Sequence, residues 1–368
     1  MKKVLKKILN LLGVLLLLLA SAGCGFFVTI TLFSGFFPAH QVILAVLAVL
    51  LLYYLSIIIH ECGHLVFGLA SGYKFSSFRI GSLMWIKQDG KIKLRRLKIA
   101  GTLGQCLMAP PKVKKGKIPV VLYNLGGVIA NIIFTAVLAL LYFLTLRYVV
   151  VALVFLLGAM LSFIIALANG IPLNAGGVPN DGMNALSLRG NKTAALAFTN
   201  QLLMNAQQAK GVSISEMPEE WFTLPDDADM QNVHCASIAV FATSRTMEKM
   251  DFEKAESEIN SLLQSGANVI GLHRNLLTCD LVYCRLVLDG KGAEISSLLT
   301  IEQQKFMKSM SKFPSVLRTQ YAIAVIRDKN AETAEKIKQK FEKCAKTYPY
   351  PQDIRSDKAM MDYADSRR

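Results

Sequence analysis

Apolar residues are concentrated in the first half of the chain, in four runs that are each long enough to cross a bilayer, which takes about 20 residues as a helix. The runs cover residues 8–33, 41–70, 118–145 and 148–170. From residue 185 onward, charged residues are frequent and apolar residues recur at helical spacing. We therefore expect a mainly α-helical protein, with a polytopic α-helical membrane domain over 1–184 and a helical soluble domain over 185–368.

Two stretches of the first half do not fit a helix. The sequence "LMWIKQDGKIKLRRLKI" (83–99) alternates imperfectly around Asp89-Gly90, a typical turn dipeptide, and predicts a small β-hairpin. The sequence "NGIPLNAGGVPNDG" (169–182) is dense in Asn, Gly and Pro and cannot form a regular helix. At membrane depth, such backbone is tolerated only where protein or a water-filled cavity satisfies its polar groups.

Charge gives the membrane domain an orientation. Before residue 184 the chain has 17 Lys and Arg against three acidic residues, whereas the remainder has 24 against 23. Twelve of these basic residues lie in 71–117, and four precede the first apolar run. The positive-inside rule then places both termini and the hairpin in the cytoplasm. The basic excess thus belongs to a multi-pass membrane domain, and we expect no nucleic-acid partner. The short Lys-rich N-terminus and the compact loops favour a bacterial cell membrane.

The first apolar run has a second interpretation. The sequence "MKKVLKKILNLLGVLLLLLASAGC" resembles a lipoprotein signal that ends at Cys24. However, Ser21 occupies a position where such signals have an aliphatic residue, and the apolar run continues beyond Cys24. We favour a retained transmembrane helix. Cleavage would leave three spans and would not remove any residue that carries candidate chemistry.

The soluble domain contains a loose internal repeat. Residues 247–266 resemble the turn and second helix of a tetratricopeptide-type repeat, and residues 325–349 resemble a second copy. The full repeat pattern is absent, and an unrelated helical bundle is the alternative. With either fold, we expect this domain to bind a cytoplasmic protein partner.

The sequence "IIIHECGHLVFG" (57–68) places an H-E-x-x-H motif inside an apolar run. His60 and His64 are spaced i, i+4, so on a helix they share one face and can hold one zinc ion together. Glu61 lies beside them and can take a proton from an attacking water. Without a function, each charged group in an apolar span would cost about 2–3 kcal/mol. The motif therefore predicts a metal site.

A catalytic zinc ion usually has a third protein ligand, and the first half offers few candidates. His40 precedes His60 by 20 residues, which is roughly 30 Å along a helix. Asp89 lies in the predicted turn. Asp181 follows the fourth apolar run, at the same predicted membrane depth as His60 and His64. Asp181 is therefore the favoured third ligand, and a plain turn residue in "NDG" is the alternative.

Three motifs, in this order, resemble those of the site-2 protease family of intramembrane zinc metalloproteases. "HECGH" is similar to the family's H-E-x-G-H, and "NLGGVIAN" (124–131) to its Gly-rich segment ending in Asn. "NGIPLNAGGVPNDG" is similar to its Asn/Pro stretch ending in Asp-Gly. The resemblance covers about residues 41–184. The last motif departs from the family pattern, because Pro172 and Asp181 are nine residues apart and Asn180 stands where the family usually has a leucine.

The resemblance implies one zinc ion per chain, held by His60, His64 and Asp181, with Glu61 as the catalytic base. It places Asn131 near the active site, where it would hold substrate or stabilise the oxyanion. By itself, Asn131 is as typical of helix packing. The implied activity is hydrolysis of peptide bonds in membrane-anchored proteins or signal-peptide remnants, near the cytoplasmic face.

A membrane-spanning substrate must unwind before cleavage, because its amides are hydrogen-bonded within its own helix. We expect the hairpin at 83–99 to offer an edge strand to the unwound segment. Two other functions are compatible with the sequence. One is a non-catalytic membrane scaffold, which would not need Glu61. The other is a metal-dependent enzyme acting on lipid or another small substrate, which the segments containing Asn131 and Asp181 disfavour.

Overall fold

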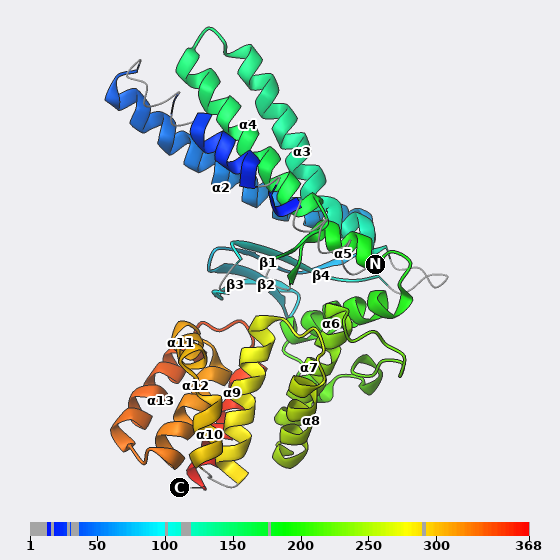
Figure 1. The fold of residues 1–368 in the computed structure, drawn as a ribbon, viewed down its shortest axis with the longest axis vertical. Coiled ribbons are helices and arrows are strands. Elements are labelled where there is room, and N and C mark those ends of the chain that lie inside the picture. The colour runs from blue at the N-terminus through cyan, green and yellow to red at the C-terminus, as the bar shows by residue number, and fades with distance from the viewer. Residues whose placement is uncertain are drawn as a thin grey trace. The chain divides into compact units, whose positions relative to one another are not determined.

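The computed structural model divides the chain into two compact units (Figure 1). The first unit comprises Met1–Gly81 and Ala100–Lys192, and the second comprises Ser82–Ile99 and Thr193–Arg368. The structure describes residues 13–15, 18–27, 30, 37–99, 102–111, 119–175, 178–288 and 292–367. The second unit therefore includes the predicted hairpin as well as most of the predicted soluble domain.

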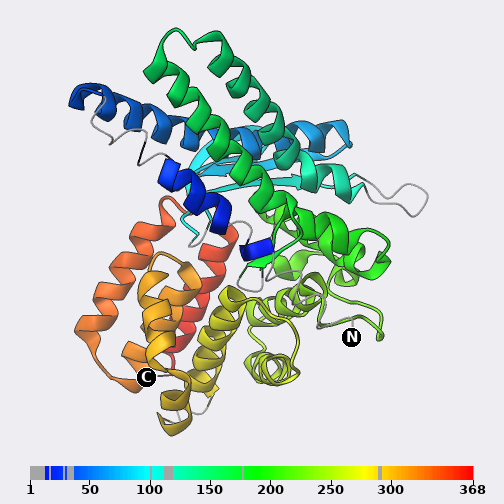
Figure 2. The same cartoon turned by 45° about the horizontal axis from the view of Figure 1, so that its top comes forward.

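Three long apolar helices pack side by side in the first unit (Figure 1, Figure 2). They are α2 (Ala39–Ala70), α3 (Val120–Leu144) and α4 (Val149–Gly170). Each is long and apolar enough to cross a membrane. They correspond to three of the four predicted runs. In the remaining run, the described residues between 13 and 27 are helical, and the rest of that prediction lies outside the described residues.

Glycines let α2 and α3 approach one another at backbone distance. A Cβ atom on Gly63 would lie 2.3 Å from the carbonyl oxygen of Gly126, and one on Gly126 would lie 2.6 Å from that of Gly63. Such close helix contacts through small residues are typical of membrane helices. Large apolar side chains on the outer faces, such as Leu51 and Leu144, are 66% and 70% exposed. A surface of this kind suits lipid better than water.

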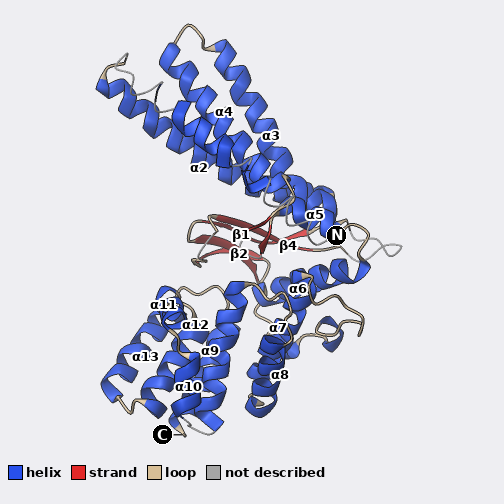
Figure 3. Ribbon diagram, viewed as in Figure 1, coloured by secondary structure: helices blue, strands red, loops and turns tan. Residues whose placement is uncertain are grey.

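A four-stranded antiparallel sheet has the strand order β3-β2-β1-β4 (Figure 3). The strands are β1 (Lys74–Ile80), β2 (Leu83–Gln88), β3 (Lys91–Arg96) and β4 (Gly104–Ala109). The predicted hairpin is confirmed as β2 and β3, joined at Asp89 and Gly90 with φ angles of 52° and 75°. These positive φ angles fit a type I′ turn. The sequence analysis did not predict β1 or β4.

One face of the hairpin belongs to the core of the second unit. Met84 and Ile86 are buried there and pack with Ala209 and with three partly buried aromatic side chains, Phe313, Tyr348 and Tyr350. The side chain of Gln88 donates a hydrogen bond to the carbonyl of Pro349 at 2.8 Å. The hairpin is therefore held by the helical unit through both apolar and polar contacts.

The remainder of the second unit is helical (Figure 3). Its helices are α6 (Lys192–Ala209), α7 (Val233–Glu248), α8 (Phe252–Gln264), α9 (Gly271–Leu288), α10 (Gly292–Leu298), α11 (Ile301–Ser309), α12 (Pro314–Ala322), α13 (Ala331–Ala345) and α14 (Pro351–Asp365). Two 3₁₀ turns (Ile214–Glu216 and Glu219–Trp221) and a π-helical turn (Ile323–Arg327) complete it. The proposed repeat segments fall on α8 and α13, and their relation to tetratricopeptide repeats stays a prediction.

The Asn/Gly/Pro stretch after α4 is irregular, as its composition predicts. Asn174–Ala175 (β5) and Val178–Pro179 (β6) form a short antiparallel pair. The helix α5 (Asp181–Leu188) follows directly and packs against α3 and α4. The start of α5 therefore lies against the end of α4, and Asp181 is the first residue of a helix.

Candidate metal centre

The H-E-x-x-H motif lies on α2, ten residues before that helix ends. His60, Glu61 and His64 are all buried. The Nε2 atoms of the two histidines are 3.2 Å apart, because residues four apart on a helix stack one above the other. The motif therefore brings two imidazole nitrogens together without help from the rest of the chain.

A backbone carbonyl fixes the orientation of His64. The Nδ1 atom lies 2.9 Å from the carbonyl oxygen of Tyr123, so Nδ1 donates the hydrogen and Nε2 keeps its lone pair. Tyr123 is itself held in place, because its hydroxyl donates to the carbonyl of Cys106 at 2.8 Å and its ring stacks on Tyr73. His64 is thus set in the tautomer that a metal ligand needs.

Asp181 completes a set of three ligand atoms. Its Oδ2 atom is 3.0 Å from His60 Nε2 and 3.3 Å from His64 Nε2. In a tetrahedral zinc site with bonds of about 2.0–2.1 Å, the ligand atoms stand about 3.3 Å apart. The three observed distances match this spacing, so the residues fit zinc. The structure thus brings together the three residues that the sequence analysis chose as ligands.

Asp181 adds a carboxylate to the two imidazoles. Two imidazoles with one carboxylate form a typical ligand set for zinc.

Glu61 packs against the start of β4. A Cβ atom on Gly104 would lie 2.4 Å from Glu61 Oε1, so only glycine leaves room for the carboxylate here. Arg79, which is 1% exposed, holds the backbone next to the start of β4. Its guanidinium donates to the Gly81 carbonyl at 2.8 Å and to the Thr102 hydroxyl. In the sequence, Arg79 is one of twelve basic residues between 71 and 117, and its position there gave no signal of burial.

The Gly-rich segment of α3 lies against His60. A Cβ atom on Gly127 would lie 2.6 Å from the imidazole Nε2 atom. Asn131 is one turn further along the same face of α3 and is 0% exposed. Neither atom of its side-chain amide has a hydrogen-bond partner among the described residues, and leaving such a group unpaired costs about 1–3 kcal/mol. The predicted role of Asn131 in holding substrate stays a prediction.

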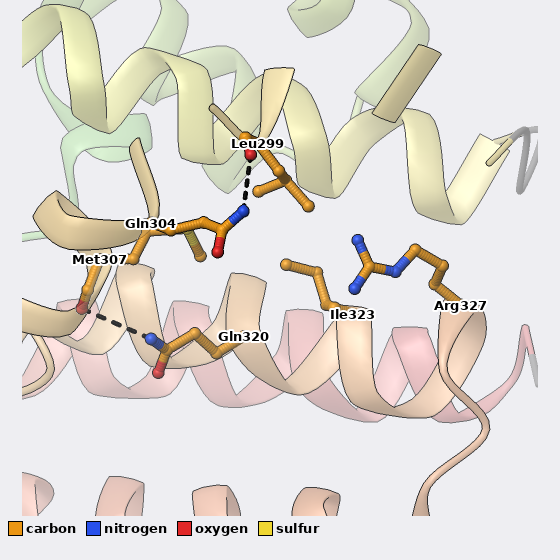
Figure 4. A pocket seen from close by; sticks show the side chains of 6 residues that line it. All are labelled: Leu299, Gln304, Met307, Gln320, Ile323 and Arg327. Carbon is orange, nitrogen blue, oxygen red and sulfur yellow. Dashed lines mark hydrogen bonds between the residues drawn. The ribbon is translucent and has the colours of Figure 1, made fainter. Parts of the chain in front are cut away.

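A separate cavity of about 230 Å³ lies in the second unit (Figure 4). Leu299, Gln304, Met307, Gln320, Ile323 and Arg327 line it. The amide groups of Gln304 and Gln320 donate to the carbonyls of Leu299 and Met307. These six residues include no metal ligand set and no nucleophile with a base, so the candidate site for chemistry is the cluster around His60.

No protein-family model, no curated protein and no solved structure matches the chain. The resemblance to site-2 proteases therefore rests on the three motifs. The structure adds their geometry: the two histidines of the first motif, the glycines of the second and the aspartate of the third lie at one place in the first unit. The function of the chain is inferred from this geometry.

Proposed function

We propose that the chain is an intramembrane zinc metalloprotease that hydrolyses peptide bonds in membrane-anchored proteins or signal-peptide remnants. The observation that carries the proposal is the convergence of His60, His64 and Asp181. Their ligand atoms come from positions up to 121 residues apart and stand at 3.0–3.3 Å from one another beside a buried glutamate. Burying this many ionisable groups is costly unless they bind something.

The proposed chemistry divides between the metal and Glu61. A bound zinc ion supplies Lewis acidity, which activates water and polarises the scissile carbonyl. Glu61 accepts the proton of the attacking water and then gives it to the leaving amine. The Gly104 backbone limits where the Glu61 carboxylate can lie, which keeps it next to the histidines. Asn131 offers its unpaired amide to the substrate backbone or to the oxyanion.

The proposed membrane location rests on the helices that carry the site. The histidines lie near the end of α2, Tyr123 near the start of α3, and Asp181 just beyond the end of α4. In an alternating arrangement of spans, these three helix ends are on the same side of the bilayer. The positive-inside rule makes that side the cytoplasm and places both termini there. The proposed cleavage therefore occurs near the cytoplasmic face of a bacterial cell membrane.

The second unit gives β3 as a strand for an unwound substrate to pair with. β3 is an edge strand of the sheet. Leu97, directly after β3, donates its N–H to the Ser82 carbonyl, so its N–H group points toward β2. N–H groups alternate in direction along an antiparallel strand, so those of Ile92 and Leu94 point away from β2. Both side chains are exposed. The hairpin ladder does not use these two N–H groups, so a substrate strand can pair with them.

Proline at these two positions tests the strand proposal. The changes Ile92→Pro and Leu94→Pro remove the outward N–H groups and leave the hairpin ladder its own donors. Cleavage is expected to be lost while zinc stays bound. The matched control, Ile92→Ala with Leu94→Ala, keeps both N–H groups and should cleave. Normal cleavage by the proline variant would eliminate β3 as the substrate strand.

The catalytic proposal is tested by Glu61→Gln. The chain is expressed with a panel of tagged membrane-anchored proteins and signal-peptide remnants, and cleavage is followed by gel mobility. Glu61→Gln should abolish cleavage, because an amide cannot accept the proton of the attacking water. The variant should still bind about one zinc ion per chain. The matched control is Glu332→Gln, which changes an exposed acidic residue of α13 and should keep full activity. Full activity of Glu61→Gln would refute the mechanism, and zinc without any cleavage by wild type would favour the scaffold.

A further inference from the structure

Asn180, the residue that departs from the family pattern, makes four side-chain hydrogen bonds. Its Oδ1 atom accepts from the backbone N–H of Leu173 at 3.0 Å and from that of Met183 at 2.9 Å. Its Nδ2 atom donates to the carbonyls of Ala168 at 2.7 Å and Ile171 at 2.6 Å. The partners belong to three different segments: the end of α4, the irregular stretch and the start of α5.

These bonds use the full capacity of a primary amide, which has two donors and two acceptor sites. No other side chain of the same length offers both. Aspartate has no donor when ionised, and leucine has neither donors nor acceptors. Ala168 and Ile171 are at the end of α4, where carbonyls lack partners within the helix. Met183 is at the start of α5, where N–H groups lack partners. One side chain thus caps both helix ends.

The backbone of Asn180 is also hydrogen-bonded to the irregular stretch and to α5. Its N–H donates to the Leu173 carbonyl at 3.0 Å, and its carbonyl accepts from the N–H of Asn184 at 2.8 Å. On the other side of Asp181, a Cβ atom on Gly182 would lie 2.1 Å from the carbonyl oxygen of Gly170. Asp181 is therefore flanked on both sides by residues that are docked onto the end of α4.

We propose that Asn180 is a positioning residue that holds Asp181 in place as the third metal ligand. This inference rests on the proposed metal site. It accounts for the departure from the family pattern: Pro172 and Asp181 are nine positions apart, and the bonds to Ala168, Ile171 and Leu173 tie the residue before Asp181 back to the end of α4. A leucine before the aspartate would supply none of these bonds.

Cobalt titration of the detergent-purified full chain tests the inference. Co²⁺ replaces zinc as a probe, and its visible absorption reports both affinity and the number of ligands. Asn180→Leu is expected to weaken Co²⁺ binding by about 10–100-fold, as loss of an outer partner of a ligand typically does. Its spectrum should approach that of Asp181→Asn, which removes the ligand directly. Asn180→Asp keeps the acceptor atom and loses the donors, and its affinity should be intermediate.

Asn330→Leu is the matched control. Asn330 also caps a helix, since its Oδ1 atom accepts from the N–H of Thr333 at 2.9 Å, but that helix is α13 of the second unit. This variant should bind Co²⁺ like wild type. Hydrogen exchange in α2 and α3 checks that each variant is folded. If Asn180→Leu misfolds, Asn180→Asp decides.

The outcomes separate the inference from the proposed function. Wild-type affinity and spectrum in both Asn180 variants, together with weak binding by Asp181→Asn, would overturn the positioning role and leave the metal site intact. Unchanged binding by Asp181→Asn would overturn the three-ligand site and, with it, the role of Asn180. The result that supports the inference is weakened binding in Asn180→Leu and Asp181→Asn, with Asn330→Leu unaffected.

Discussion

The two units each bury a cluster of ionisable side chains, and the clusters differ in what they contain. In the second unit, Arg318 lies between two carboxylates, 3.1 Å from Asp357 Oδ1 and hydrogen-bonded to Asp280, with its guanidinium 4.7 Å from the centre of the Tyr283 ring. This arginine–aspartate cluster has its own cation. The cluster in the first unit consists of two imidazoles and one carboxylate, from His60, His64 and Asp181, and each can offer a ligand atom to a metal ion.

The difference shows how a buried polar cluster can be recognised as structural or as functional. Arg318 joins α12 to α9 and α14, and its bonds end on groups of the same unit, so the cluster is explained by the fold it stabilises. The histidine–aspartate cluster points three electron pairs at one location. Such an arrangement fits a bound cation. Each cluster can therefore serve as the control for the other.

Metal removal should have the largest effect, and only on the first unit. Where free zinc is about 1,000-fold above its Kd, binding stabilises a site by about 4 kcal/mol. Treatment with a chelator should therefore speed hydrogen exchange in peptides around His64, Tyr123 and Met183 by up to about 1,000-fold. Exchange in α9, α12 and α14 should not change. Equal loss of protection in both units would show that the comparison is wrong.

Arg318→Met should destabilise the second unit and leave the first unit unchanged. It leaves Asp280 and Asp357 buried without their cation, and removing one partner from a buried ion pair costs about 3–5 kcal/mol. Denaturant unfolding of the full chain should show a destabilised second unit, while zinc content stays near one per chain. Arg327→Met is the control, because the ion pair between Arg327 and Asp328 is exposed and should contribute less than about 1 kcal/mol. A zinc-free Arg318→Met protein with a folded first unit would contradict the independence of the clusters.

Gly104→Ala should lower cleavage by about 10–100-fold, with zinc retained. The added methyl group would lie 2.4 Å from Glu61 Oε1, so the carboxylate must move away from its place beside the histidines. A displacement of about 1 Å in a catalytic group can cost 100-fold in rate. The control is Gly271→Ala, where no atom lies within 4 Å of the added Cβ. Equal rates in the two variants would remove the steric argument for Gly104.

The smallest expected effect is a pH dependence of the second unit. Burial raises the pKa of Asp357 from 3.8 to about 7, and it also raises the pKa of Asp280. The folded unit therefore binds more protons than the unfolded chain between about pH 4 and 7. Stability should fall as pH rises through that window and level off above it.

Asp357→Asn provides the check on that prediction. The amide cannot ionise, so denaturant unfolding of this variant should depend less on pH than that of wild type. A wild-type second unit that gains stability between pH 5 and 8 would show that Asp357 is ionised in the folded state across the whole range. Zinc content should be the same in both proteins.

The sequence predicted the elements with strong local patterns. Three apolar runs of about 20 residues or more became α2, α3 and α4, and Asp89-Gly90 became the hairpin turn. The i, i+4 spacing of His60 and His64 fixes their geometry within one helix. Asp181 was found because few acidic residues occur in the first half, so elimination was possible.

Features that depend on tertiary contacts were not predictable. β1 and β4 have no clean alternation, and their pairing is set by the fold around them. Nothing local distinguishes the buried Arg79 from the other basic residues of its loop. The role of Asn180 needs the end of α4 and the start of α5 to meet, which its own neighbours in sequence do not reveal. The grouping of the hairpin with the second unit is likewise a matter of packing between distant segments.

The central claim is that His60, His64 and Asp181 hold one metal ion. The most direct measurement is zinc per chain, by elemental analysis of the detergent-purified wild type and of Asp181→Ala, with Asp89→Asn as the control. The account predicts about one zinc ion in wild type and in Asp89→Asn, and a much lower content in Asp181→Ala. Unchanged zinc in Asp181→Ala, or a folded wild type that takes up no zinc, would contradict it.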